Sequence, residues 1–379
     1  MKVLFISHEA SQTGAPFALL QELKYLRENH KDIECEVLML WRGDLFDEFK
    51  KLFPTFKGWF DPTIFNRILG KLKFKRAIKP YLYACKYSNF DAIYANSVAS
   101  FHAAVEIKRK YNIPLIGHVH EAENLLIEFK MSKDLLLEFD KLIAVSGLTA
   151  RNLKEIYDVP SEKIVIQRPV SYFVDKAIKE KTIIKSANIP TKKVVIGIVC
   201  KGNWWKGIEL IPVAIKNFFN HYPDANCIFA IHGGIDDSAL THLKYDLRES
   251  GMIDRVMLGG VMKNPVEYYA RYDIFLLLSR EESFSLVAQE AAFVGTPIVG
   301  FERVTGAAEW LADGAGLLVP YMDFDKLSES IYTLYEDNNL RNKIAIKAKE
   351  KIMKMYYEDL PMTNIMKAIY SATRGGKTP

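Results

Sequence analysis

Two lysines in the second half of the chain have a spacing that suits phosphate binding. Lys201 and Lys206 lie five positions apart in the segment Val199–Gly207, directly after an apolar run. Two ammonium groups on such a loop can bind the same phosphate, and charge-assisted hydrogen bonds are about twice as strong as neutral ones. The alternative is a basic loop that is simply solvated, and the spacing alone leaves both open.

Two glutamates further along form a second candidate pair. Glu282 follows the apolar run Ile274–Leu278, and Glu290 lies eight positions later in a helix that we expect to begin near Phe284. Amides at a helix start attract anions, and an ionised carboxylate accepts several hydrogen bonds from sugar or ribose hydroxyls. In the alternative, Glu282 is solvated and Glu290 belongs to a surface pattern.

Polar residues also follow strand candidates in the first half. The segment Ser7–Pro16 joins the first strand to a helix, and Gly14 would permit a tight turn there. His118 and His120 end another strand two positions apart, so both side chains point to one face and a metal has to be considered. No further ligand pattern accompanies them, and we expect no metal.

One sequence pattern runs through the whole chain and predicts the strands and helices that position these residues. Short apolar runs alternate with segments of helical periodicity, which is typical of parallel α/β structure. Ligands of such sheets bind at the carboxyl ends of the strands. Strands are expected at Val3–Ser7, Glu34–Trp41, Ala92–Ala95, Leu115–Val119, Leu142–Ser146, Ile164–Gln167, Val194–Val199, Cys227–Ile231, Val256–Leu258, Ile274–Leu278, Pro297–Gly300 and Gly316–Val319.

Two domains are expected, because 379 residues exceed what one hydrophobic core usually supports. The apolar periodicity fades near residues 171–192, where we expect a linker. Residues 1–170 would form an N-terminal domain, completed by the C-terminal helix 356–379. Residues 193–355 would form a second domain. The predicted fold class is α/β, with two Rossmann-like doubly wound domains that face each other across a cleft.

Composition restricts the partners and the location. The formal net charge of +5 suits anionic partners but is too small to indicate nucleic acid. The four cysteines are scattered without a CxxC pair, which favours free thiols in a reducing compartment. No apolar run approaches the roughly 20 residues that span a bilayer. We expect a cytoplasmic protein, either soluble or peripheral at the inner face of the cytoplasmic membrane.

The segment 57–86 is basic and aromatic together. Between Arg67 and Lys86 it holds seven basic residues and no acidic one, with aromatic residues interleaved. Such a segment can lie on an anionic membrane surface. The alternative is a solvated helix whose apolar face packs on the N-terminal domain.

The residues from Lys193 to Val319 resemble the donor domain of the family 4, or group 1, retaining glycosyltransferases with the GT-B fold. The family has two glutamates separated by seven residues, as in Glu282 and Glu290, and a basic loop that resembles Lys201 with Lys206-Gly207. Further matches in the same order are Ile231–Gly234, Asp254–Val261, Gly306–Glu309 and Gly314–Pro320.

This resemblance implies that residues 1–170 form the acceptor-binding domain and residues 193–355 the donor-binding domain. It also implies roles for the candidate residues of the second half. Glu290 would bind the ribose hydroxyls, and Glu282 would lie beside the donor sugar. Lys201 and Lys206 would bind the diphosphate. The diphosphate cradle would be completed by backbone amides of Ser283, Phe284, Ser285 and Leu286.

In the first half, the loop with Gly14 would close over the phosphates, and His120 would hydrogen-bond the donor sugar or stabilise developing charge. The chain departs from the family pattern at three positions. Lys201 replaces the usual Arg, so the charge is kept while the bidentate fork is lost. Ser285 and Cys200 stand where Gly is usual, which narrows the room for a close backbone approach.

The expected activity is retaining transfer of a sugar from a nucleotide diphosphate sugar to a glycan or lipid-linked acceptor. It would serve cell-surface polysaccharide, lipopolysaccharide or glycolipid synthesis and need no metal or other cofactor. The alternatives are a GT-B-fold nucleotide-sugar epimerase and a non-catalytic sugar-nucleotide-binding partner subunit. A NAD dehydrogenase is disfavoured, because no GxGxxG motif follows the first strand.

Overall fold

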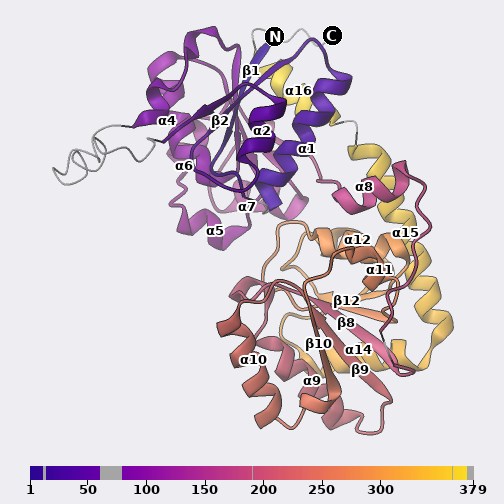
Figure 1. Ribbon diagram of the computed structural model, residues 1–379. Coiled ribbons are helices and arrows are strands. Elements are labelled where there is room, and N and C mark those ends of the chain that lie inside the picture. Colours follow the sequence, from indigo (N-terminus) through magenta and orange to yellow (C-terminus); the bar gives the residue numbers. More distant parts are fainter. Residues whose placement is uncertain (12–13, 60–78, 190, 361, 374–379) are drawn as a thin grey trace. The chain divides into compact units, whose positions relative to one another are not determined.

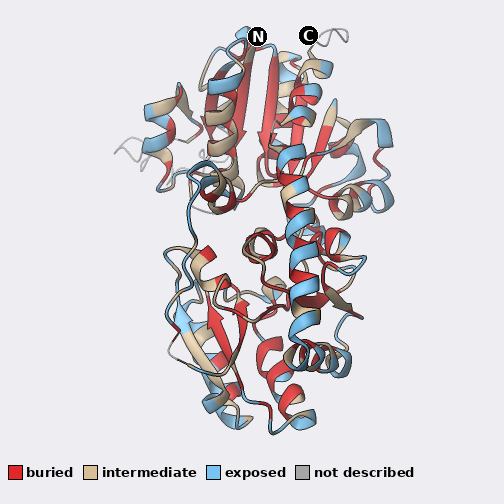
Figure 2. Cartoon of the chain, turned by 90° about the vertical axis from the view of Figure 1, so that its right-hand side faces the viewer, coloured by how far each residue is buried: buried red, intermediate tan, exposed pale blue. Residues whose placement is uncertain are grey.

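A computed structural model shows that the chain folds as two compact α/β units (Figure 1). The first unit comprises Met1–Gln167 and Met362–Pro379, and the second comprises Arg168–Pro361. The structure describes residues 1–11, 14–59, 79–189, 191–360 and 362–373. Each unit contains one parallel sheet with helices on its faces. The central strands of both sheets are buried, whereas edge strands such as β3 (Thr55–Lys57) and β10 (Val256–Gly260) are partly exposed (Figure 2). The prediction of two Rossmann-like doubly wound domains is confirmed.

The sheet of the first unit has the strand order β3-β2-β1-β4-β5-β6-β7. The order reverses between the neighbours β1 and β4, and such a reversal is where doubly wound sheets bind ligands. The strands are β1 (Lys2–Ser7), β2 (Glu34–Met39), β3 (Thr55–Lys57), β4 (Ala92–Asn96), β5 (Leu115–Val119), β6 (Lys141–Ala144) and β7 (Ile164–Ile166).

Both faces of this sheet are apolar, which explains the continuous apolar runs of its strands. Along β1, Leu4 and Ile6 pack into one core cluster, whereas Val3 and Phe5 pack into another on the opposite face. The helices are α1 (Gly14–Asn29), α2 (Phe46–Leu52), α4 (Phe101–Tyr111), α5 (Glu123–Glu128), α6 (Lys133–Leu137), α7 (Gly147–Glu155) and, from the C-terminus, α16 (Thr363–Ala372). Ile365 and Ile369 of α16 complete the second cluster.

The sheet of the second unit has the order β10-β9-β8-β11-β12-β13, with its reversal between β8 and β11. Its strands are β8 (Val194–Val199), β9 (Cys227–His232), β10 (Val256–Gly260), β11 (Ile274–Leu277), β12 (Ile298–Phe301) and β13 (Leu317–Val319). Its helices are α8 (Tyr172–Lys179), α9 (Leu210–His221), α10 (Asp237–Glu249), α11 (Pro265–Tyr269), α12 (Leu286–Val294), α13 (Ala307–Leu311), α14 (Phe324–Glu336) and α15 (Asn338–Asp359).

The domain boundaries differ from those expected. Part of the expected linker 171–192 is helix α8, whose Val174 and Ala177 are buried and which packs on α11 and α12. The hydroxyl of Tyr356 in α15 also donates to Asp175 Oδ1 at 2.9 Å. The segment therefore belongs to the second unit, because a short helix can bury one apolar face without a long periodic pattern. The second unit also continues to Pro361, and not only to residue 355.

No helix among the described residues is long and apolar enough to cross a membrane. Residues 60–78, most of the basic and aromatic segment 57–86, lie outside the described part of the chain. Membrane contact through that segment therefore stays a prediction.

Candidate functional site

The basic loop of the second unit follows β8, next to the reversal of its sheet. It ends in a 3-10 turn, η6 (Trp204–Lys206), in which the Asn203 side chain accepts a hydrogen bond from the Lys206 amide at 3.3 Å. Gly207 then adopts a left-handed conformation with φ 68°. A Cβ at Gly207 would lie 2.1 Å from the Leu278 carbonyl oxygen, so only glycine fits where the loop meets the end of β11.

Lys206 and Glu282 form an ion pair across this end of the sheet. The ammonium of Lys206 contacts Glu282 Oε1, and Ser279 Oγ donates to Glu282 Oε2 at 2.9 Å. The side chains of Lys206 and Glu282 are 25% and 11% exposed. The alternative of a solvated Glu282 is therefore wrong. The backbone supports the pair, because the amide of Arg280 donates to the Trp205 carbonyl at 2.9 Å.

Lys201 lies at the start of the same loop and is exposed. Within the described part of the chain, its ammonium makes no ion pair or side-chain hydrogen bond with another residue. The two lysines therefore differ: Lys206 is fixed by a carboxylate, whereas Lys201 faces solvent and would have to move to a ligand.

The start of helix α12 lies next to Glu282 in the chain. The helix begins at Leu286, two residues later than expected, because Ser285 is left-handed with φ 78° and caps it. The Ser285 hydroxyl accepts a hydrogen bond from the Ala288 amide at 3.4 Å. Phe284 is buried, and a Cβ at Gly306 would lie 2.1 Å from the Ser283 carbonyl oxygen, so this turn packs closely on the chain before α13.

Glu290 lies inside α12 and is only 6% exposed. Ser171 Oγ donates to Glu290 Oε1 at 2.6 Å. Burial raises the pKa of Glu290 to about 7, and the hydrogen bond from Ser171 opposes this shift. The alternative of a solvated surface glutamate is therefore wrong, because this carboxyl is a buried, hydrogen-bonded group.

The same turn of α12 binds the chain segment that precedes α8. The amide of Ser171 donates to Gln289 Oε1 at 2.6 Å, and Gln289 Nε2 donates to the Pro169 carbonyl at 3.2 Å. Ser171 and Gln289 are both buried. The sequence does not predict these contacts, because Ser171 lies outside any periodic segment and far from α12 along the chain.

Tyr269, at the end of α11, lies near both glutamates and was also missed. Its buried hydroxyl interacts with the Glu290 carboxyl. Burial, then the negative charge of Glu290 and more weakly that of Glu282, raise the pKa of Tyr269 well above its usual value. The sequence offered no signal for it beyond a tyrosine pair in a short helix.

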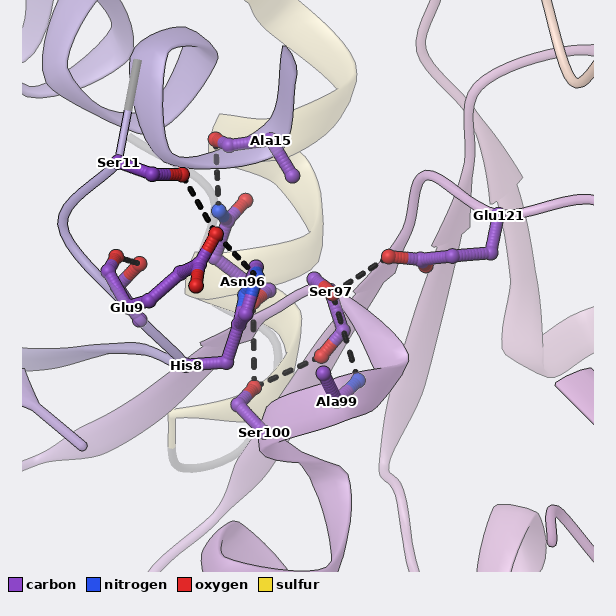
Figure 3. A network of polar contacts seen from close by, with 10 residues as sticks. His8, Glu9, Ser11, Ala15, Asn96, Ser97, Ala99, Ser100 and Glu121 are labelled. Carbon is purple, nitrogen blue, oxygen red and sulfur yellow. Dashed lines mark hydrogen bonds and ion pairs between the residues drawn. The ribbon is translucent and has the colours of Figure 1, made fainter. Parts of the chain in front are cut away.

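In the first unit, polar residues gather at the carboxyl ends of β1, β4 and β5 (Figure 3). His120 Nε2 lies 2.8 Å from Asn96 Oδ1, and Asn96 Nδ2 donates to the Ala15 carbonyl at 2.9 Å. Asn96 is fully buried. It was missed by the sequence reasoning, although a polar residue directly after an apolar strand is a signal that could have indicated it.

The loops after β4 and β5 are joined by Glu121. Its carboxylate accepts a hydrogen bond from the Ser97 hydroxyl (Figure 3). It also accepts hydrogen bonds from the Val98 amide at 3.2 Å and the His120 amide at 3.0 Å. Burial raises the pKa of Glu121, and these hydrogen bonds oppose the rise. We assign Glu121 to holding the two loops together.

Gly14 and His118 are two further candidate residues of the first unit. Gly14 is the exposed first residue of α1, and a Cβ there would meet nothing within 4 Å. Residues 12 and 13 before it lie outside the described part of the chain, so the tight turn stays a prediction. His118 is buried, with Nδ1 2.6 Å from the Tyr94 hydroxyl. No group of His, Cys, Asp or Glu among the described residues is arranged to bind a metal ion.

Two family models match the chain in sequence order. The model described as Glycosyltransferase Family 4 matches residues 14–170, and the model described as Glycosyl transferases group 1 matches residues 179–351. The chain belongs to the group 1, family 4 glycosyltransferases.

This glycosyltransferase is similar to curated proteins over part of their length. It is 28% identical over 232 residues to a D-inositol 3-phosphate glycosyltransferase from Corynebacterium urealyticum, with 58% of this chain and 54% of the relative covered. It is 27% identical over 214 residues to the lipopolysaccharide core biosynthesis mannosyltransferase LpsB of Rhizobium meliloti, with 54% and 58% covered. The matches therefore span little more than half of each relative.

The GT-B fold of this glycosyltransferase is seen in its likeness to solved structures. HepE from Anabaena, in complex with UDP, matches with a TM-score of 0.73 and 18% identity, with 97% of this chain and 99% of that one covered.

The structure brings together Lys206 and Glu282 of the predicted residues and places the start of α12 directly after them in the chain. Glu290 is buried deeper in the same unit, while Gly14 and His120 lie at the equivalent edge of the first unit.

Proposed function

We propose that this glycosyltransferase is a retaining, metal-independent enzyme. It would move a sugar from a nucleotide diphosphate sugar to a glycan or lipid-linked acceptor. The observation that carries the proposal is the ion pair of Lys206 and Glu282 beside the start of α12, at the reversal of the second sheet. This is the edge at which doubly wound sheets bind phosphorylated ligands.

The lysines and the helix start supply the charge that this reaction needs. When the bond between sugar and diphosphate breaks, negative charge grows on the diphosphate, and positioned cationic groups stabilise it. Lys206 suits this role because Glu282 fixes its ammonium, while Ser279 fixes Glu282 in turn. Positioning before reaction matters, because a group that is already in place costs no reorganisation in the transition state.

A metal-independent mechanism is proposed because Lys201 and Lys206 already carry two positive charges on one loop. Glu282 offsets one of these charges in the ligand-free protein, and it is the residue that we place beside the donor sugar. A sugar hydroxyl that donates to Glu282 would offset part of the negative charge on this carboxylate, so that more of the positive charge of Lys206, held in place, acts on the phosphate.

Retention is proposed without a protein nucleophile. The leaving diphosphate would accept the proton of the acceptor hydroxyl on the same face of the sugar, through a short-lived oxocarbenium-like pair. The carboxyl groups of the site suit other roles: Glu282 is paired with Lys206, and Glu290 is buried against Ser171.

The relatives support the substrate classes. HepE was solved with UDP, which supports a nucleoside diphosphate as the leaving group. The two curated relatives are named for transfer to an inositol phosphate and for assembly of a lipopolysaccharide core, which supports a polyol or glycan acceptor. We propose that the work takes place at the cytoplasmic face of a membrane, with the segment 57–86 on anionic lipid.

A donor panel tests this proposal. The purified protein is incubated with UDP-, GDP- and ADP-sugars in the presence of a chelator, with and without lipid-linked glycan acceptors. The expected result is release of one nucleoside diphosphate and a product with the anomeric configuration of the donor, read by NMR. An inverted product, a strict requirement for added metal, or conversion of the donor sugar to an epimer without acceptor would each contradict it.

A further inference from the structure

Trp204 is a large apolar residue that the basic loop of the second unit exposes to solvent. It is 47% exposed and is the first residue of η6, between Lys201 and Lys206. The backbone around it is fixed, because its carbonyl accepts a hydrogen bond from the Gly207 amide at 3.0 Å and the Asn203 side chain caps the turn. The exposure of this indole is therefore a defined feature of the loop.

The guanidinium of Arg280 covers one face of this indole. Its carbon Cζ lies over the ring of Trp204, 5.2 Å from the centroid, which is a cation–π contact. The backbones of the two loops support this contact, because the Arg280 amide donates to the Trp205 carbonyl at 2.9 Å. The ring is therefore held from one side, and its exposed area is left for a ligand.

The contact of Trp204 with Arg280 lies next to the ion pair of Lys206 with Glu282. Both contacts join the loop after β8 to the loop after β11. In each loop, the partner in the first contact precedes the partner in the second by two positions. Two residues span at most about 7 Å. A ligand that contacts Lys206 or Glu282 therefore lies within reach of the indole.

An aromatic face beside charged groups favours a sugar ring as the ligand. A pyranose has a face of C–H groups, which carry a small positive charge and pack against the negative face of an aromatic ring. Its hydroxyls lie around its edge, and an ionised carboxylate such as that of Glu282 accepts hydrogen bonds from them. A purely apolar ligand would have to bury these charged groups without hydrogen bonds, which is costly.

We infer that Trp204 is a sugar-binding residue, and that a pyranose ring of the donor or of the acceptor packs against the indole face opposite Arg280. This inference rests on the proposed function, which places sugar transfer at Lys206 and Glu282. Because Arg280 already holds the ring in the ligand-free protein, little side-chain freedom is lost when the sugar binds.

The first experiment measures donor binding by calorimetry. The nucleotide sugar identified by the donor panel and its free nucleoside diphosphate are titrated into the wild type, Trp204→Leu and Trp204→Phe. Leucine is apolar but has no aromatic face, whereas phenylalanine keeps one. If the donor sugar packs on the ring, Trp204→Leu binds the nucleotide sugar about 10-fold or more weakly, and Trp204→Phe is less affected. Binding of the free nucleoside diphosphate should not change.

The second experiment measures the acceptor by steady-state kinetics with the same variants. If an acceptor sugar packs on the ring, the KM for the acceptor rises by about 10-fold or more in Trp204→Leu, and by less in Trp204→Phe. The KM for the donor then stays at the wild-type value. Either result supports the inference, and the two results distinguish the source of the sugar.

Tyr245→Leu is the matched control, because Tyr245 is 55% exposed on α10 and its ring also lies against an arginine, with Arg248 Cζ 5.4 Å from its centroid. It should change neither measurement. All these side chains are exposed, so the variants should fold, which thermal unfolding verifies.

Two outcomes would overturn the inference. One is a Trp204→Leu protein that binds the donor and uses the acceptor like the wild type. The other is an equal loss of affinity for the nucleotide sugar and the free nucleoside diphosphate, which would mean that the indole packs on the base. A wild type that binds the nucleotide sugar through Trp204 but transfers no sugar would contradict only the proposed function, so the two can fail separately.

Discussion

Lys206 and Glu282 are separated by 76 positions in the sequence and form an ion pair at the edge of the second sheet. The parallel pairing of β8 with β11 accounts for this, because it places the loops that follow both strands next to each other. Gly207 adds a second constraint, since it brings the basic loop against the end of β11. The order of the strands therefore brings Lys206 and Glu282 together, and Gly207 permits the close contact between the basic loop and the end of β11.

Replacing Lys206 by alanine should lower kcat by about 100- to 1000-fold, the usual cost of removing one group that stabilises a leaving charge. The fold should remain intact, because the ammonium is partly exposed. Steady-state kinetics with the donor identified by the panel measures this. Lys216→Ala, at an exposed position of α9, is the control and should transfer sugar normally. Wild-type turnover by Lys206→Ala would refute the phosphate assignment.

Nucleotide binding should release protons from Glu290. Its pKa of about 7 leaves it roughly half protonated at pH 7. Ribose hydroxyls that donate to the carboxylate favour the charged form, so binding should release up to about half a proton. Calorimetry with the nucleoside diphosphate in buffers of different ionisation enthalpy measures this number.

Glu290→Gln should abolish that release and weaken binding by about 10- to 100-fold, the worth of hydrogen bonds to a charged group. Glu329→Gln, on the exposed face of α14, should change neither. Proton release that persists in Glu290→Gln would show that another group titrates.

The sequence could predict the elements and the strand ends, because apolar runs and the polar residues after them are local features. Lys201, Lys206 and Glu282 were found in this way. Asn96 and Tyr269 were not, because their roles depend on which strands and helices become neighbours.

The contacts of Ser171 likewise could not be predicted from the sequence. Its partners Glu290 and Gln289 lie more than a hundred positions away in the chain, and only packing of the segment before α8 onto α12 brings them together. The sequence predicts a linker where helix α8 lies, because the eight residues of this helix are too few to show a periodic pattern. Helix α12 itself was predicted, but the left-handed residue Ser285 delays its start.

The buried Glu290 should also make stability depend on pH in a defined direction. A carboxyl whose pKa is higher in the folded protein than the ordinary 4.5 binds its proton more tightly when folded. The contribution of Glu290 to the free energy of unfolding is therefore largest at low pH and is lost as the pH rises from about 4.5 to about 7. The size of this loss is about 3 kcal/mol.

The measurement is urea unfolding of the wild type and of Glu290→Gln between pH 4.5 and 8. The difference in unfolding free energy between the two proteins should fall with rising pH and level off above pH 7. Comparing the two proteins cancels the titration of the other buried groups, such as Glu22 and His118. A difference that does not vary with pH would mean that Glu290 is charged throughout this range.

Ser285 should be a position where glycine stabilises the protein. Its φ of 78° is unfavourable for any residue with a Cβ, at a cost of about 1 kcal/mol or more. Glycine removes this cost and sacrifices only a long capping hydrogen bond to the Ala288 amide, worth a few tenths of a kcal/mol. Ser285→Gly should therefore raise the unfolding free energy by about 0.5 to 1 kcal/mol.

Ser285→Ala is the matched variant, because it keeps the backbone cost and loses the cap. It should lower the unfolding free energy by about 0.5 to 1 kcal/mol. Urea unfolding of the two variants and of the wild type measures both changes in unfolding free energy. If alanine and glycine shift stability in the same direction, the conformation of residue 285 does not limit the stability of α12.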